Sequence, residues 1–204
     1  MRKLVTLFAA VLSAWVGYAQ SGSEVLSSLS DKMGAMNAYQ IDFELVMPTA
    51  TDSSKGSCKV WGERYVIAID DMKQGSDGSV VWTLIGANQE VTLDSPNPQS
   101  RSLFDNPTRA FDFAEELFEV VDFDDSVEGV WKLVLRPAEG VLDGIEYVVL
   151  NVNRATSLPV KLGYDMGGLG LYINIQSVTP TEVTGEEFRF VPESYPDYEI
   201  IDFR

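Results

Sequence analysis

The sequence predicts a mostly β (α+β) fold: an unclosed antiparallel half-barrel with a lid of short helices over a hydrophobic cavity. Two observations predict it. Segments in which apolar and polar residues alternate follow one another through most of the chain, as strands with one buried face do. Two other segments carry apolar residues at helical spacing, so they are available to cover the apolar face of a curved sheet.

The first 19 residues have the features of a secretory signal peptide. Arg2 and Lys3 precede an apolar run over residues 4–16, and small residues lead up to a cut after Ala19. A buried first helix kept in the protein is the alternative. We expect export and a single domain over residues 20–204.

The charge of the chain excludes some partners. Its 204 residues carry a net charge of −16, and loss of Arg2 and Lys3 would leave 13 basic against 31 acidic residues, a charge of −18. Nucleic acids and anionic membranes attract basic segments, so we expect neither as a standing partner. No later stretch approaches the ~18 apolar residues of a spanning helix, so we expect no stable membrane insertion. We also expect a monomer.

The mature chain begins with a predicted helix from Ser23 to Ala38. Its apolar stripe contains Leu26, Leu29, Met33 and Met36, which is typical of core packing and also of adaptable binding surfaces. A strand follows over residues 39–47, and alternation places Ile41, Phe43 and Leu45 on one face together with Tyr39 and Met47.

A central meander of strands is predicted from Gly56 to Leu93. Tyr65, Ile67 and Ile69 share one face of its first full strand. Asp77-Gly78 is a turn signal, and the strands that follow contain Trp82, Leu84 and Val91. We expect these six apolar side chains to contribute to one apolar face. The single cysteine, Cys58, lies in a predicted strand as a small packed hydrophobe rather than a reactive thiol.

The second half contains a helix and then further strands. The helix is predicted over residues 107–118, with Pro107 in its first turn. The later strands repeat one apolar face, which contains Trp131, Leu133, Leu162, Tyr164, Leu171 and Ile173. Segment 145–152 is apolar on both faces, which suggests a helix packed outside the sheet at Leu150 and Val152.

Residues suited to catalysis are scarce. The chain has no histidine, no phosphate-binding glycine loop and no GxSxG motif. Asp122, Asp124, Asp125 and Glu128 could hold calcium, but their spacing favours a solvated turn. Asp70-Asp71 is typical of a strand end. We therefore expect a binding protein that is not an enzyme and has no catalytic residues, cofactor or metal.

The order of elements resembles the periplasmic outer-membrane lipoprotein carrier family (LolA-like). The residues that carry the resemblance are Asp77-Gly78, with Trp82 four residues after the glycine, and the ending Phe188-Arg189-Phe190-Val191-Pro192 before a short acidic tail. The resemblance implies a periplasmic shuttle that accepts lipoprotein acyl chains from an inner-membrane release complex and delivers them to an outer-membrane acceptor. It also implies an arginine between barrel and lid, and Arg64 is the nearest candidate.

The residues expected to line the cavity are Ile41, Phe43, Leu45, Tyr65, Ile67, Ile69, Trp82, Leu84, Val91, Trp131, Leu133, Leu162, Tyr164, Leu171 and Ile173, and those of the lid are Leu29, Met33, Met36 and Arg64. Three alternatives stay open. A carrier of another acyl lipid or a glycolipid would need the same cavity. A protein-interaction module would pack a partner against the same face, and an enzyme would use a carboxylate pair.

Overall fold

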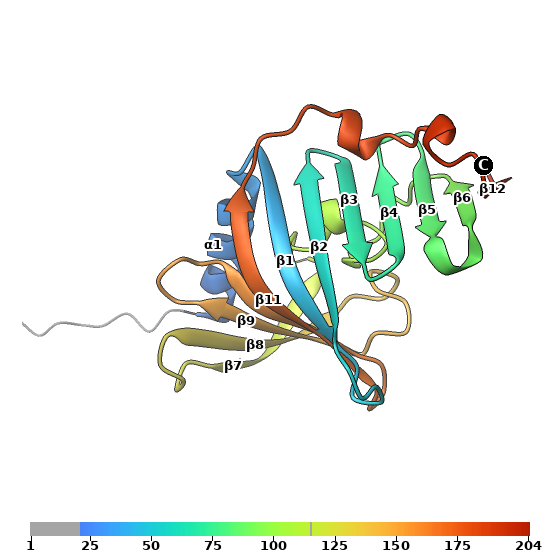
Figure 1. The fold of residues 1–204 in the computed structure, drawn as a ribbon. Helices are drawn as coiled ribbons and strands as arrows, with labels where there is room; N and C mark the ends of the chain where they lie inside the picture. Colours follow the sequence, from blue (N-terminus) through green and yellow to red (C-terminus); the bar gives the residue numbers. More distant parts are fainter. Residues whose placement is uncertain (1–20, 115) are drawn as a thin grey trace, which may run out of the picture.

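A single sheet organises the molecule. The structure is a computed structural model that describes residues 21–114 and 116–204, so the signal peptide predicted at residues 1–19 lies outside the described residues. The strands of the described chain form one sheet in the order β12-β6-β5-β4-β3-β2-β1-β11-β10-β9-β8-β7, and its two edges do not pair (Figure 1). Neighbours are antiparallel, except for the parallel pair β12 and β6. The predicted mostly β, unclosed sheet is confirmed.

The strands are β1 (Ala38–Val46), β2 (Ser54–Trp61), β3 (Arg64–Ile69), β4 (Met72–Ser76), β5 (Val81–Ile85), β6 (Glu90–Asp94), β7 (Phe118–Asp124), β8 (Val130–Pro137), β9 (Tyr147–Asn153), β10 (Pro159–Asp165), β11 (Gly170–Pro180) and β12 (Glu199–Asp202). The described residues also form one α-helix, α1 (Gly22–Gly34), and the 3-10 turns η1 (Gly86–Asn88), η2 (Pro107–Arg109), η3 (Glu186–Phe188) and η4 (Pro192–Ser194).

Helix α1 is the first predicted helix, somewhat shorter than expected. Ser21 accepts a hydrogen bond from the Glu24 backbone, and the Glu24 side chain accepts one from the Ser21 backbone, so a capping box fixes its start. Its apolar stripe is buried at Val25, Leu26, Leu29 and Met33. The helix ends at Gly34, because β1 begins at Ala38 and the chain must turn before it.

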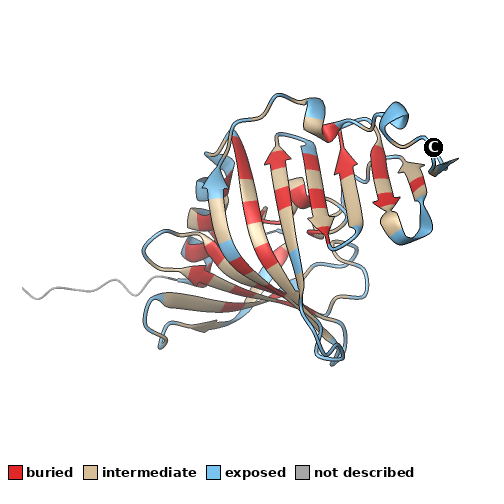
Figure 2. Ribbon diagram, viewed as in Figure 1, coloured by how far each residue is buried: buried red, intermediate tan, exposed pale blue. Residues whose placement is uncertain are grey.

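Most of the core lies on the face of the sheet that α1 covers, which we call the inner face. Buried and partly exposed residues alternate along the strands, as Figure 2 shows. The register places Leu133 opposite Leu150, Leu150 opposite Leu162, and Leu162 opposite Ile173, so one apolar row crosses β8 to β11. On β1 the Phe43 ring lies over Gly56 of β2, where an added Cβ would come within 2.4 Å of it.

The second predicted helix, over residues 107–118, is wrong. Among the described residues of this stretch only η2 is helical, and strand β7 already begins at Phe118. The buried residues of this stretch are Pro107, Ala110, Phe111, Phe113 and Phe118, and Phe113 does not lie on the helical face that the other four would share. The described residues of segment 95–117, which we call the cover loop, therefore pack on the core by their aromatic side chains without forming an α-helix.

The apolar side of the sheet changes from the inner to the outer face between β3 and β6. Tyr65 is paired with Ser76, and Ser76 with Val81, so Trp82 points to the opposite face from Tyr65. A separate cluster forms on this outer face around Trp82, Leu84 and Val91, with Val66, Leu93, Phe190, Tyr195 and Tyr198 packed against it. The C-terminal segment, residues 181–204, covers this cluster and then adds β12 to the sheet edge (Figure 1).

The sequence left open why segment 145–152 is apolar on both faces, and the structure accounts for part of it. Val148, Leu150 and Val152 of β9 all lie on the inner face and are buried. The outer face holds Tyr147 and Val149, which are only partly buried. The helix suggested outside the sheet is wrong, because the one α-helix of the described chain packs on the inner face.

A carboxylate holds the C-terminal segment near its start. Hydrogen bonds from the Glu187 backbone N–H and from Thr184 lower the pKa of the Glu187 carboxyl to about 2, and Lys59 lies 3.6 Å from it. A lowered pKa stabilises the fold above the ordinary value of 4.5, and this contribution is lost as the pH falls toward 2.

We therefore expect the segment to loosen between pH 4.5 and 2, which tryptophan fluorescence would detect because Trp61 and Trp82 both contact it. Glu187→Gln cannot ionise and should lack this acid-dependent step. An unchanged acid transition in that variant would contradict the assignment.

Candidate functional site

The cover loop rests on the inner face through a few hydrogen bonds and buried apolar side chains. The backbone N–H of Leu103 donates to the Tyr164 hydroxyl at 3.0 Å, and the Tyr65 hydroxyl donates to the Asp105 carbonyl at 3.2 Å. Ser30 of α1 donates to the Phe111 carbonyl at 3.1 Å. These three contacts connect the loop to the sheet at two points and to the helix at one.

The phenols under the loop are protonated near neutral pH, as tyrosines with an ordinary pKa are. Burial is the main cause that raises the pKa of Tyr164 and of Tyr65 further. Burial likewise raises the pKa of the Cys58 thiol, which is fully buried among core side chains. The prediction of Cys58 as a packed hydrophobe is confirmed.

A pocket opens where three segments meet: the end of α1, the β2–β3 turn and η2. Its volume is about 590 Å³, which falls in the range of small-molecule sites. The pocket is lined by Ser30, Met33, Gly34, Met36, Asn37, Tyr39, Val60, Gly62, Glu63, Thr108, Arg109, Phe111 and Asp112. Methionines and aromatic rings therefore form its apolar part, and that part is continuous with the core.

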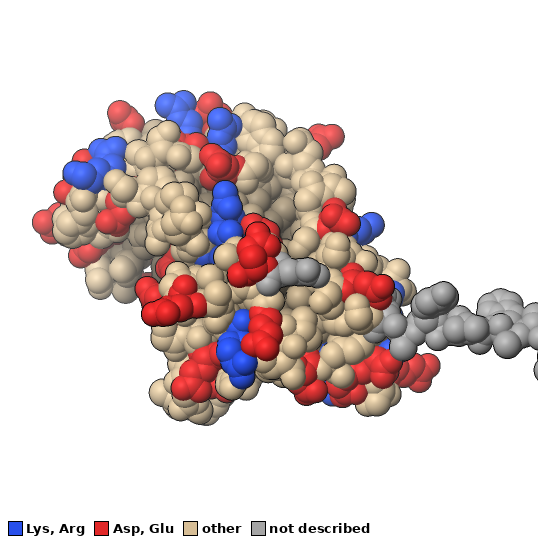
Figure 3. Space-filling view, turned by 180° about the vertical axis from the view of Figure 1, so that it is seen from behind, with Lys and Arg blue, Asp and Glu red and all other residues tan. Residues whose placement is uncertain are grey.

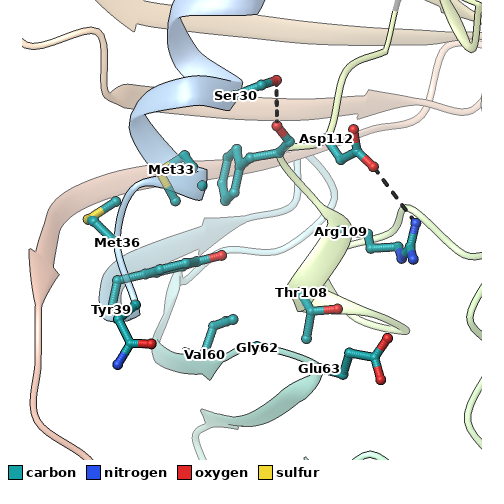
Figure 4. A pocket seen from close by; sticks show the side chains of 13 residues that line it. Ser30, Met33, Met36, Tyr39, Val60, Gly62, Glu63, Thr108, Arg109 and Asp112 are labelled. Atoms are coloured by element: carbon teal, nitrogen blue, oxygen red, sulfur yellow. Dashed lines mark hydrogen bonds and ion pairs between the residues drawn. The ribbon is translucent and has the colours of Figure 1, made fainter.

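The charged residues of the pocket lie together on one side. Figure 4 shows Met33, Met36 and Tyr39 on one side, and Glu63 and Arg109 on the other. Asp112 lies 3.9 Å from Arg109 and 3.5 Å from Arg101, so one carboxylate joins two arginines of the cover loop. The arrangement can hold an apolar chain against the methionines and leave a polar group at the charged rim.

Twelve of the predicted cavity residues lie together in the main core: Ile41, Phe43, Leu45, Tyr65, Ile67, Ile69, Trp131, Leu133, Leu162, Tyr164, Leu171 and Ile173. They fill the space beneath α1 and the cover loop, and do not line the open pocket. Of the predicted lid residues, Met33 and Met36 line that pocket, and Leu29 is buried in the core. Their contact with a ligand stays a prediction.

Three predicted cavity residues lie elsewhere. Trp82, Leu84 and Val91 belong to the outer cluster under the C-terminal segment, and the Trp82 Nε1 donates to the Phe188 carbonyl at 3.0 Å. The expectation that they share the face of Tyr65 is wrong. Strand β4 was not predicted, and its pairing decides which face of β5 turns inward.

Arg64 does not reach the helix. It neighbours Tyr65 in β3, so alternation sends its side chain to the outer face, where the guanidinium lies 4.6 Å from the centre of the Trp61 ring. The expected contact between Arg64 and the lid is therefore wrong in this structure. The arginines near the pocket are Arg109 at its rim and Arg101 behind it.

The sequence reasoning missed Leu103 of the cover loop, which is buried. Phe111 falls on the apolar face of the helix predicted over residues 107–118, but it is buried and lines the pocket from a loop. One feature of the sequence could have indicated this: residues 95–117 are rich in Pro, Asn and Asp, as loops are, but also contain many apolar residues, as segments packed on a core do. Tyr39 and Val60 also line the pocket, from the start of β1 and the end of β2.

Comparison with known proteins gives likeness in fold. No protein-family model matches the sequence, and no curated protein matches it. The structure is similar to that of an uncharacterised conserved protein from Thermus thermophilus, with a TM-score of 0.59 and 12% identity over 90% of this chain and 99% of that one. The likeness is one of fold. At this identity it says nothing of ligand or partner.

Two further solved structures show weaker likeness. A LolA superfamily protein from Nitrosomonas europaea has 11% identity over 84% of this chain and 99% of its own, with a TM-score of 0.46. A putative outer membrane lipoprotein-sorting protein domain from Vibrio parahaemolyticus has 11% identity over 81% and 95%, with a TM-score of 0.49. Neither likeness is strong enough to bear on the ligand or partner of this chain.

Proposed function

We propose that this protein is a non-enzymatic, exported carrier that binds the acyl chains of lipoproteins and shuttles them across the periplasm between the inner and outer membranes. One observation carries the proposal. The inner face of the sheet is apolar across eight strands, and in the described residues one helix, the cover loop and the loop between β8 and β9 cover it. A pocket lined in part by methionines opens between the helix and the cover loop.

The energetics favour such a carrier. A sixteen-carbon chain costs on the order of 12 kcal/mol to expose to water, at ~0.8 kcal/mol per methylene group. An acylated protein therefore needs an apolar site to cross an aqueous compartment. The site must also release its ligand, so the protein should replace the ligand by its own side chains.

The cover loop meets this requirement. Its Leu103 and Phe111 occupy the inner face when no ligand is present, and an entering chain would take over the contacts that they make. Binding affinity is then a difference between two sets of apolar contacts, which keeps it moderate. The few hydrogen bonds of the loop let it move while the sheet stays paired. A glycolipid or another acyl lipid would use the same mechanism.

The test compares binding of a palmitoylated peptide with binding of the same peptide without its acyl chain. Met36→Asp places a carboxylate among the apolar residues of the pocket, and we expect it to weaken binding of the acylated peptide at least about tenfold. Fluorescence anisotropy of the labelled peptide measures the dissociation constant.

Val191→Asp is the matched control, because Val191 is 43% exposed and lies outside the pocket. It should bind as the unchanged protein does. Equal binding by Met36→Asp and Val191→Asp would contradict the pocket assignment. Equal binding of the acylated and plain peptides by the unchanged protein would contradict the carrier function itself.

A further inference from the structure

Two neighbouring hairpins carry exposed apolar residues at one end of the sheet. Met47 follows β1, and Met166 and Leu169 flank the turn between β10 and β11; they are 45%, 45% and 59% exposed. The loop after β1 lies beside this turn, because Val46 is paired with Tyr172 of β11. We call these three residues the apolar tip.

The turn between β10 and β11 is tight and holds its two apolar residues together. Gly167 and Gly168 have φ values of 74° and 94°, which glycine adopts without strain. The Met166 backbone N–H donates to the Leu169 carbonyl at 2.9 Å, so these residues face each other across the hairpin. The tip is therefore a defined, protruding apolar feature.

The tip continues the apolar inner face. Alternation along β10 and β11 places Met166 and Leu169 on the same face as Tyr164 and Leu171. Leu171, like Leu45 at the end of β1, packs against the main core but stays partly exposed. An unbroken series of apolar side chains thus runs from the core to the tip.

The apolar side chains of the tip stand beside acidic groups. Residues 47–51 and 166–171 contain no charged side chain, but Asp52 and Asp165 flank these stretches and the Glu146 carboxylate lies beside Gly167. Acidic groups are spread over the face seen in Figure 3. The pocket lies near the opposite end of β1 and has Glu63, Arg109 and Asp112 at its rim. The apolar tip and the charged rim of the pocket therefore lie at opposite ends of β1.

We propose that the apolar tip docks on the surface of a lipid bilayer and inserts Met47, Met166 and Leu169 among the acyl chains. Protein interfaces combine apolar contacts with about ten hydrogen bonds. The side chains of Met47, Met166 and Leu169 provide no such bonds, and the insertion of apolar side chains among acyl chains does not require them. The inference rests on the proposed function in one respect: a carrier must contact the membrane that supplies or accepts its cargo, which gives the docking its role.

The charge of the protein predicts how this docking depends on lipid and salt. Anionic headgroups repel an acidic protein, so we expect stronger binding to phosphatidylcholine vesicles than to vesicles that contain phosphatidylglycerol. Salt should strengthen binding to the anionic vesicles, because it screens the repulsion. A protein that binds through basic residues would show the opposite dependence on both.

The experiment is vesicle co-flotation of the cargo-free protein. Leu169→Asp should lower the bound fraction at least about tenfold on phosphatidylcholine vesicles, and Leu169→Trp should raise it, because tryptophan favours the interface. Phe203→Asp is the control: Phe203 is 65% exposed but lies after β12, away from the tip, and its replacement should change nothing. All these side chains are exposed, so folding should be retained.

Each outcome supports or overturns the inference. Loss of flotation in Leu169→Asp alone supports it. Equal flotation of Leu169→Asp and Phe203→Asp, absence of flotation in the unchanged protein, or binding weakened by salt overturns it. The acylated-peptide assay contains no membrane. Binding to the peptide but not to vesicles would therefore contradict only the membrane docking of the tip, and binding to vesicles but not to the peptide would contradict only the carrier function.

Discussion

Replacing Trp82 with alanine is expected to lower the free energy of unfolding by about 3–5 kcal/mol, the cost typical of removing a buried tryptophan. The side chain is 3% exposed, and its ring lies over Gly75, where an added Cβ would come within 2.4 Å of it. Its Nε1 also donates to the Phe188 carbonyl, so the substitution removes one attachment of the C-terminal segment, which β12 continues to hold at the sheet edge. Chemical denaturation measures the loss.

Trp82→Phe separates packing from hydrogen bonding. It keeps an aromatic ring but leaves the Phe188 carbonyl without its donor, and we expect a smaller loss of about 1–3 kcal/mol. Because Trp82 lies on the outer face, this variant should bind the acylated peptide as well as the unchanged protein does. A marked loss of binding with stability retained would place the ligand on the outer face.

Leu103→Ala is expected to destabilise the cover loop by about 2–5 kcal/mol, because the side chain is fully buried and its removal leaves a cavity. The effect should be local. Hydrogen exchange should accelerate in residues 95–117 more than in β1 or β2, and the acylated peptide should associate faster as the loop opens more often. Exchange mass spectrometry and stopped-flow binding measure the two effects.

Phe104→Ala is the control for this prediction. Phe104 neighbours Leu103 in the chain but is only partly buried, so its removal should have a smaller effect on exchange. A uniform rise in exchange across the sheet for Leu103→Ala would show that loop and sheet open as one unit. The cover loop could not then exchange with a ligand independently, and the proposed mechanism would fail.

Alternation alone predicted much of the core. Leu133, Leu162 and Ile173 each lie on an apolar face that the sequence identified, and the register brings the three faces into one row. This works because antiparallel strands with one buried face keep a strict period of two. The sheet of the structure therefore agrees with the fold class predicted from the sequence.

The rest depended on long-range pairing. Alternation shows which residues of one strand share a face, but it does not show which face of the next strand matches. Strand β4 is rich in polar residues and was not predicted, so the placement of Trp82 could not be deduced. In the cover loop, tertiary burial of Phe111 and Phe113 outweighed the helical tendency of the sequence.

Strand β3 contributes to two apolar clusters that lie on opposite faces of the sheet. Ile67 belongs to the core under the cover loop, and its neighbour Val66 packs against the cluster under the C-terminal segment. A substitution in one cluster is thus separated from the other by a layer of hydrogen-bonded backbone. Over evolution, the residues of the two clusters can therefore change largely independently of one another. A fold built this way tolerates wide sequence change, in keeping with the 12% identity at which its architecture recurs in the Thermus protein.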